Sequence, residues 1–327
     1  MKKLLSKLIF VISLLIPTAV FAHEQWFAGT PEMQSPLPYF FVDWSAARIA
    51  ITIGFVVLLI VSLFIGPFIN KFKISKKIEE KVTSVSAFAP QLVRGAIGIL
   101  MIMASSQGLL FAPDLHLKAV PLAFSISLWV LQYVVGFAFV LGIFMRPAAA
   151  ISILLYGAAF AFFPLKNLLS YLSLAGIFVY LFAIGNPSNV GFLFCEKLRK
   201  INSWLAAHEV LAMKIMRILF GLSFISMGIL FKLTTPQMSL AILAVHPVIN
   251  FLAQFGFTNE MFVYAAGLSY VLFGILYIFN ILPRIVSLKL IGLFTATIFV
   301  FGLGELFGHI PLLAGFFAIL TQKQKES

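Results

Sequence analysis

The most constraining feature of this sequence is a succession of apolar runs of about 17 to 22 residues, the length of α-helix that crosses a bilayer. Short clusters of charged residues separate the runs. Of the 327 residues, 61% are hydrophobic and only 10% are charged, whereas soluble domains contain roughly 45–50% apolar residues. These features exclude a soluble globular protein. They predict an all-α polytopic membrane protein that contacts the lipid bilayer along most of its length.

The first 22 residues have the pattern of a secretory signal peptide. Three lysines lie within the first seven residues, an apolar run follows, and the segment ends in the small-x-small sequence Val-Phe-Ala. We expect cleavage after Ala22. An uncleaved anchor helix is the alternative, which the short apolar run disfavours. The mature chain then begins at His23, followed by a polar periplasmic arm over residues 23–45.

About nine membrane spans are predicted after the signal peptide. They are expected at residues 46–66, 92–111, 122–143, 147–163, 168–186, 215–233, 261–281, 285–303 and 307–321. A basic loop at 67–91, a linker at 187–213 and a tail at 322–327 would all be cytoplasmic. The span at 46–66 is an extra helix ahead of two related halves.

Lys and Arg are unequally divided between the two sides that this arrangement predicts. Outside the signal peptide, sixteen fall on the side of the C-terminus and four on the other side. Cytoplasmic loops of membrane proteins carry the excess of basic residues. We therefore expect a bacterial inner-membrane protein with a periplasmic mature N-terminus and a cytoplasmic C-terminus. Orientation then explains the net charge of +12, so no nucleic-acid partner is expected.

The two halves after the first span share an internal repeat. A shift of 123 residues places Arg94 on Arg217 and Gly98 on Gly221. Farther on, a span that starts at Gly136 parallels one that starts at Gly267, and each ends at a cytoplasmic arginine. Similar spacing of Gly and Pro by chance is the alternative explanation.

The repeat predicts two four-helix units, at residues 92–186 and 214–321. Both units enter the membrane from the cytoplasm, so the repeats are parallel and not inverted.

Polar residues distinguish the two copies, because a polar group in a membrane is costly and usually has a task. The second half keeps Lys232 near the outer end of a span. Its sequence GELFGHIP then places Glu305 and His309 one helical turn apart, where the first half has GAAFAFFP. We therefore expect a polar site on the outer side of the second half and none in the first. Ion pairs that only tie helices together are the structural alternative.

Histidines suggest two further roles on the outer side. His246, a candidate ligand contact together with Lys232, Glu305 and His309, belongs to a segment at 236–258 that is longer than its counterpart. We expect an amphipathic helix there that covers the polar site. If His23 is the first residue, its α-amine and imidazole could chelate copper, with His116 as a second candidate ligand. Intrinsic haem is not expected, because His309 has no second mid-membrane histidine to pair with.

The second half resembles the DoxX-like membrane protein family. The resemblance rests on RILFGLSFISMGILFKLTTP at 217–236, on GELFGHIP at 304–311 and on AHEQWF at 22–27. The first half matches the same frame more loosely. Members of this family are four-helix membrane units found with quinone oxidoreductases and redox-defence proteins. The resemblance implies a redox-linked membrane subunit or accessory, with Lys232, Glu305 and His309 at its polar positions. The tandem form and the N-terminal arm depart from the simple family member.

Three functions remain open at this point. The first is a redox-associated subunit that binds a quinone, either as a non-catalytic part of a quinone-linked oxidoreductase or as an accessory to membrane or periplasmic redox proteins. The second is a copper-handling or metal-transport protein that faces the periplasm. The third is an assembly or scaffold protein without a ligand.

Overall fold

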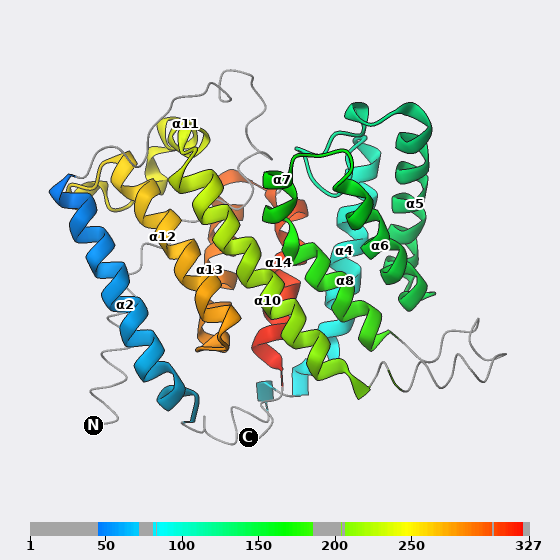
Figure 1. The fold of residues 1–327 in the computed structure, drawn as a ribbon, viewed down its shortest axis with the longest axis horizontal. Coiled ribbons are helices and arrows are strands. Elements are labelled where there is room, and N and C mark those ends of the chain that lie inside the picture. The colour runs from blue at the N-terminus through cyan, green and yellow to red at the C-terminus, as the bar shows by residue number, and fades with distance from the viewer. Residues whose placement is uncertain are drawn as a thin grey trace. The chain divides into compact units, whose positions relative to one another are not determined.

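The fold is all-helical in the computed structural model, which describes residues 45–71, 81–82, 84–185, 204, 207–302 and 304–322. Within these residues the only β-type pairing is an isolated bridge between Leu109 and His116. The predicted all-α polytopic class is confirmed (Figure 1). The signal peptide, nearly all of the periplasmic arm, most of the cytoplasmic linker, and residues 72–80 and 83 of the basic loop lie outside the described residues.

Six of the described helices are long and apolar enough to cross a membrane, and three further apolar helices are shorter. The six long ones are Ala46–Ile69, Val85–Ser106, Leu122–Leu141, Glu209–Leu233, Asn259–Ile278 and Pro283–Phe301, and the shorter ones are Met145–Ala159, Leu172–Ile184 and Leu306–Thr321. Each of the nine predicted spans overlaps one of these helices. The short helix α7 (Leu165–Ser170) precedes α8 (Leu172–Ile184), so the fifth predicted span is broken near its N-terminal end.

The described residues form two compact units. Unit 1 takes in those of Met1–Phe72 and Phe224–Leu282, and unit 2 those of Lys73–Ser223 and Pro283–Ser327. The boundaries fall inside α10 (Glu209–Met227) and between α12 (Asn259–Ile278) and α13 (Pro283–Phe301). The compact units therefore do not coincide with the two halves of the sequence repeat.

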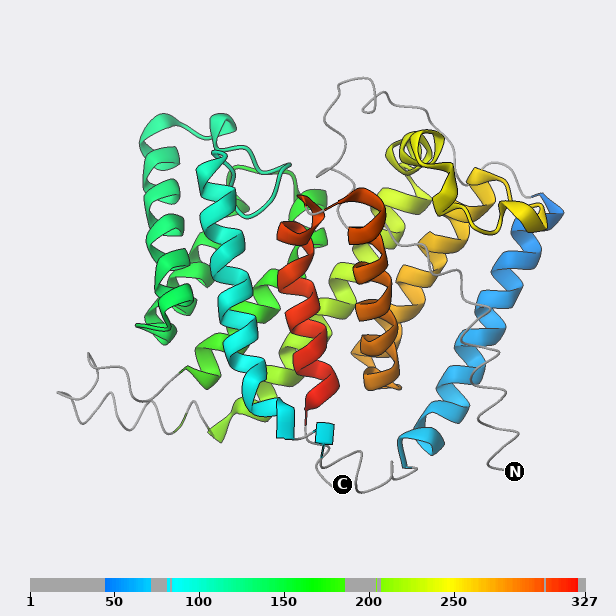
Figure 2. The same cartoon turned by 180° about the vertical axis from the view of Figure 1, so that it is seen from behind.

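Unit 2 shows directly how helices of the two sequence halves combine. Helix α14 (Gly304–Thr321) packs against α13, its neighbour in sequence, and also against α4 (Ala89–Ser106) from the first half. Figure 2 shows α14 and α4 side by side. On its other side α4 packs against α5 (Leu122–Leu141), while α6 (Met145–Ala159) packs against α8. The last helix of the chain thus completes the packing of the first half.

Arginines near the start of three helices in unit 2 bind the end of a neighbouring antiparallel helix. Arg94 donates to the carbonyls of Phe139 and Val140 (2.8 and 2.9 Å), Arg146 to those of Phe182 and Ala183 (3.1 and 3.0 Å), and Arg284 to that of Gln322 (2.8 Å). The last four carbonyls of a helix lack intrahelical partners and favour a cation. Arg146 and Arg284 are each the second residue of the third helix in their half, and each binds the end of the fourth. This equivalence supports the predicted repeat.

Pairs of glycines let helices approach closely in both units. A Cβ on Gly98 of α4 would lie 2.7 Å from the carbonyl oxygen of Gly136 on α5. In unit 1 a Cβ on Gly228 would lie 2.7 Å from the carbonyl oxygen of Gly267 on α12. Small residues allow such backbone contact between membrane helices. Gly267 occupies the place of Gly136 in the second pair, as the repeat predicts. Its partner, however, is Gly228 and not Gly221, the residue that the sequence alignment paired with Gly98. Gly228 lies two helical turns after Gly221.

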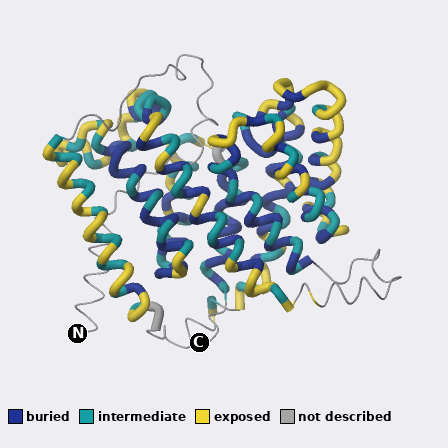
Figure 3. Tube along the Cα trace, in the orientation of Figure 1, coloured by how far each residue is buried: buried dark blue, intermediate teal, exposed yellow. Residues whose placement is uncertain are grey.

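The extra first helix, α2 (Ala46–Lys71), packs against α12 in unit 1. The hydroxyls of Thr52 and Tyr264 share a hydrogen bond of 2.8 Å, and Gly66 lies against the side chain of Ile281. Most of the remaining surface of α2 is exposed (Figure 3). Large apolar side chains such as Phe64 and Phe68 lie on it. That surface suits contact with lipid.

The contact between Gly98 and Gly136 makes a testable prediction for stability. We expect Gly98→Ala to lower the free energy of unfolding by about 1–3 kcal/mol, because the new methyl group forces α4 and α5 apart. Gly95 on the same helix has nothing within 4 Å of its Cβ position, so Gly95→Ala is the matched control. The control should leave stability unchanged or raise it slightly. Thermal unfolding of the detergent-purified variants measures both, and equal midpoints for the two variants would contradict close packing at Gly98.

Candidate functional site

Lys232 is a fully buried lysine in a membrane span of unit 1. Its side chain is only 1% exposed, and its Nζ donates a hydrogen bond of 3.1 Å to the Ser239 hydroxyl. The same Nζ lies 5.7 Å from the centre of the Tyr270 ring. A cation over an aromatic face is attracted by the ring quadrupole. The side-chain nitrogen of Lys232 is therefore close to both a hydroxyl and an aromatic ring.

A change of helix type places Lys232 at this position. Helix α10 continues into a π-helical segment, η6 (Gly228–Leu233), which packs against α12. Segments of π-helix are rare in proteins, and those that do occur are often found at functional sites. The hydroxyls of Thr234 and Thr235 then donate to the carbonyl of Leu230 and close the end of the segment.

The outer segment predicted at 236–258 contains a helix that contacts Lys232. Helix α11 (Gln237–Val245) follows η6 directly, and Ser239 lies on it. Two 3-10 turns, Pro247–Ile249 and Ala253–Phe255, lead on to α12. Helix α11 therefore contacts Lys232 through Ser239, while His246 is half-buried just after the end of α11.

Aromatic rings form the other side of the Lys232 site. The ring of Tyr270 stacks on that of Phe224, with centroids 5.4 Å apart, and Phe224 also contacts Tyr277 at 6.3 Å. All three side chains are fully buried. Planar apolar rings of this kind favour the binding of another planar ring.

His309 is buried in unit 2, whereas Lys232 belongs to unit 1. The His309 side chain is 1% exposed, its Nδ1 lies 3.3 Å from the Thr297 hydroxyl, and its ring meets that of Phe294 edge to face at 4.9 Å. Glu305 lies in the first turn of α14, and its side chain lies outside what the structure describes. Of the three polar residues predicted to share a site, Lys232 and His309 thus lie in different units, and the side chain of Glu305 is not described.

Of the two candidate metal ligands, His23 and His116, only His116 lies in the described residues. No group of three or more His, Cys, Asp or Glu side chains suited to a metal ion occurs in the part of the chain that the structure describes. His116 is exposed beside the short helix Leu117–Ala119. His208 contacts the Trp204 ring at 4.2 Å, and His23 lies outside the described residues.

The first half of the sequence also holds an organised polar network, which corrects the expectation that it has none. Gln132, on α5, is fully buried. Its side-chain oxygen accepts from the backbone N–H of Phe111 (3.0 Å), and its side-chain nitrogen contacts the carbonyls of Met101 and Leu109 (3.2 and 3.0 Å) and the Ser105 hydroxyl (2.8 Å). One side chain thus fixes the loop between α4 and α5.

That loop, residues 107–121, also carries the carboxylate of Asp114. The Tyr171 hydroxyl, between α7 and α8, donates to Asp114 Oδ1 at 2.5 Å. Burial raises the pKa of Asp114 to about 6, although the hydrogen bond from Tyr171 and the charge of Lys166 lower it. The sequence signals were a glutamine within an apolar span and an aspartate in a short apolar loop, and sequence reasoning gave neither any weight.

Comparison with known proteins identifies no relative. No model of a protein family matches the chain, and neither the curated proteins nor the solved structures contain a significant match.

The contacts of Gln132 predict a large effect of its substitution. We expect Gln132→Leu to destabilise the protein, because each buried backbone group left without its partner costs about 1–3 kcal/mol. Gln107→Leu, at an exposed glutamine just after α4, is the control and should have little effect. The midpoints of thermal unfolding in detergent test the difference. Equal midpoints would show that the network contributes nothing to stability.

Proposed function

We propose that this chain is a redox-linked integral membrane protein of the DoxX-like kind that binds a quinone at Lys232. It would serve as a subunit or accessory of a quinone-linked oxidoreductase in a bacterial inner membrane. The observation that carries the proposal is the buried side-chain nitrogen of Lys232, close to the ring of Tyr270 and hydrogen-bonded to the hydroxyl of Ser239.

The side chains around the Lys232 nitrogen have the chemistry that a quinone headgroup needs. A quinone offers a planar ring and carbonyl oxygens that accept hydrogen bonds. Lysine supplies donors and no acceptor, and the rings of Tyr270 and Phe224 offer aromatic faces. An ionisable side chain within a membrane span is a functional candidate by default, because burying it is costly.

His309 is the second candidate donor in this proposal. Its imidazole is buried among the rings of unit 2 next to the Thr297 hydroxyl. A neutral imidazole can donate a hydrogen bond to a carbonyl oxygen or exchange a proton with a reduced quinone. Lys232 and His309 belong to different compact units, so each residue is tested by its own variant.

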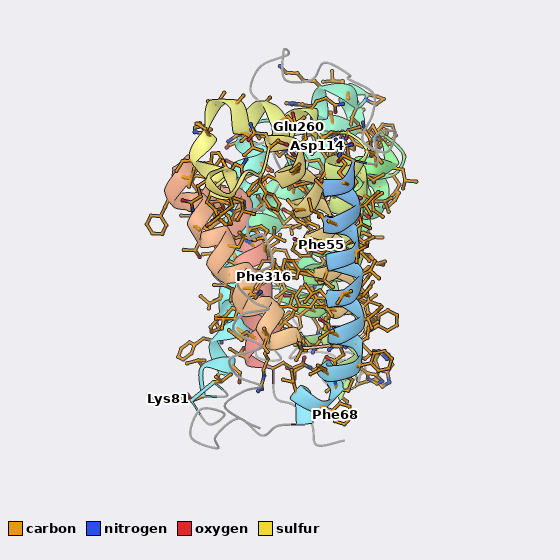
Figure 4. All side chains as sticks on the ribbon, turned by 90° about the vertical axis from the view of Figure 1, so that its left-hand side faces the viewer. Phe55, Phe68, Lys81, Asp114, Glu260 and Phe316 are labelled. Carbon is orange, nitrogen blue, oxygen red and sulfur yellow. The ribbon has the colours of Figure 1, made fainter. Side chains whose placement is uncertain are left out.

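The proposed orientation keeps the C-terminus in the cytoplasm and the mature N-terminus in the periplasm. It rests on the distribution of Lys and Arg along the sequence. In unit 2, Asp114 and Lys81 lie at opposite ends of the helices, so the basic side and the loop side are well separated (Figure 4).

Native mass spectrometry of the detergent-purified protein tests the quinone site. We expect a bound quinone after incubation with a short-tailed benzoquinone, and we expect Lys232→Met to weaken binding by about tenfold or more. The reason is that a hydrogen bond to a charged group is worth about 1.5–3 kcal/mol. Lys232→Arg, which keeps a cationic donor, should retain part of the binding.

Lys214→Met is the matched control, because Lys214 lies on the same helix with its side chain exposed. The control should bind the quinone as the parent does. Equal quinone occupancy in Lys232→Met and in the parent would contradict the site. His309→Ala tests the second donor by the same measurement, independently of unit 1.

A further inference from the structure

The connection between Lys232 and Glu260 joins two membrane spans and contains no charged residue. It folds as α11 followed by two 3-10 turns, and Figure 1 shows it at one end of the helices of unit 1. Charged side chains are mostly found on protein surfaces that face water. A connection of this length without any charge indicates a surface that contacts something other than water.

Apolar side chains are exposed on the second part of this connection, residues 244–257. Val248 is 74% exposed and Phe255 is 71% exposed. Val245 and Phe251 are exposed as well, so exposed apolar side chains recur every three or four residues. An accumulation of exposed apolar side chains marks a surface that contacts a membrane or another protein.

The backbone of residues 244–257 is hydrogen-bonded within the connection. The side chain of Asn250 donates from Nδ2 to the carbonyl of Phe257 and to Oδ1 of Asn259, both at 3.0 Å. The backbone N–H groups that donate to nearby carbonyls are those of His246, Ile249, Asn250, Ala253, Phe255, Gly256 and Phe257. A backbone paired in this way loses little on leaving water, because only unpaired polar groups are costly in apolar surroundings.

The loop at the corresponding point of the first half, residues 107–121, has the opposite arrangement. Its polar residues His116 and Lys118 are exposed. Seven of its apolar side chains are buried: Leu109, Leu110, Phe111, Ala112, Leu115, Leu117 and Val120. That loop therefore exposes polar groups, as a loop in water does, whereas residues 244–257 expose apolar ones.

We propose that residues 244–257 insert into the boundary between the headgroups and the acyl chains of one leaflet. The partner is the phospholipid bilayer, and Val248, Phe251 and Phe255 are the side chains that enter it. Interfacial segments of this kind bury their apolar side about 5–10 Å into the boundary. The inference is independent of the quinone proposal, because it concerns only the lipid contact of this segment.

Lipid fits this surface better than a second protein does. Protein interfaces surround an apolar centre with a polar rim, whereas the whole connection between Lys232 and Glu260 is free of charged residues. At both ends the connection continues into apolar helices that are long enough to cross a membrane. The lipid contact of these spans can therefore extend onto the connection without crossing a charged boundary.

Spin labelling of the full-length protein tests the insertion, in nanodiscs of phosphatidylcholine and phosphatidylglycerol that hold one copy each. A nitroxide is attached at Val248→Cys or Phe255→Cys in a Cys195→Ser background, which removes the natural cysteine. Its collision rates are measured with oxygen, which dissolves in lipid, and with a polar nickel complex. We expect the oxygen-to-nickel ratio to exceed that at Lys118→Cys by about threefold or more, because apolar surroundings exclude the polar complex.

Two reference positions decide the outcome. Lys118→Cys, in the loop at residues 107–121, reports water, and Val134→Cys, in the middle of α5 and 60% exposed, reports lipid. Labels at Val248 and Phe255 should give ratios between these two. Ratios equal to that at Lys118 would place the segment in water and overturn the proposal. Low collision rates with both reagents would show that protein covers the segment, which would also overturn it.

Charged substitutions test whether the exposed apolar side chains cause the insertion. With the label at Phe251→Cys, the double substitution Val248→Asp and Phe255→Asp should lower the oxygen-to-nickel ratio towards that at Lys118, because a charge in lipid is costly. Replacing the same two residues by leucine is the matched control and should keep the parent ratio. An unchanged ratio in the aspartate variant would overturn the assignment of these side chains to lipid.

Discussion

The requirement that buried polar groups find partners without water determines most of the described structure. In a bilayer, unsatisfied backbone groups cost several kcal/mol each. The ends of helices are where backbone carbonyls lack partners within the helix. In unit 2, arginines from neighbouring helices donate hydrogen bonds to these carbonyls. Arg94, Arg146 and Arg284 each donate to terminal carbonyls of an adjacent helix. The loop between α4 and α5 meets the same requirement through Gln132.

The same two devices, arginine at a helix end and glycine at a helix crossing, occur in both sequence halves. Their recurrence supports a duplication more strongly than the scattered identities in the sequence do. The two halves differ in the polar groups that they bury. The second half has a lysine in a π-helical segment that contacts α11, whereas the first half has a tightly folded loop with a half-buried aspartate. Each copy thus has its own polar centre at the corresponding point of the chain.

The sequence predicted the positions of the helices well, because the length of an apolar run is set by the thickness of the bilayer. It also singled out Lys232, since a lysine inside an apolar run is rare. It did not predict the compact units, because hydropathy does not encode which helices touch. The contact of α14 with α4 depends on side-chain packing between distant segments. Gln132 was missed for a similar reason, as its partners are backbone groups of a loop whose fold no pattern indicates.

The length of α6 and α8 has a consequence for the surrounding lipid. With 15 and 13 residues and a rise of about 1.5 Å per residue, these helices measure about 20–22 Å, less than the roughly 30 Å of a typical hydrocarbon core. Leu154 on α6 is 71% exposed, so the surface of this short helix is accessible to lipid acyl chains. Hydrophobic mismatch of this kind thins the adjacent bilayer. We therefore expect the bilayer to be locally thinner beside α6, and the protein to accumulate in membrane regions whose hydrocarbon core is already thin.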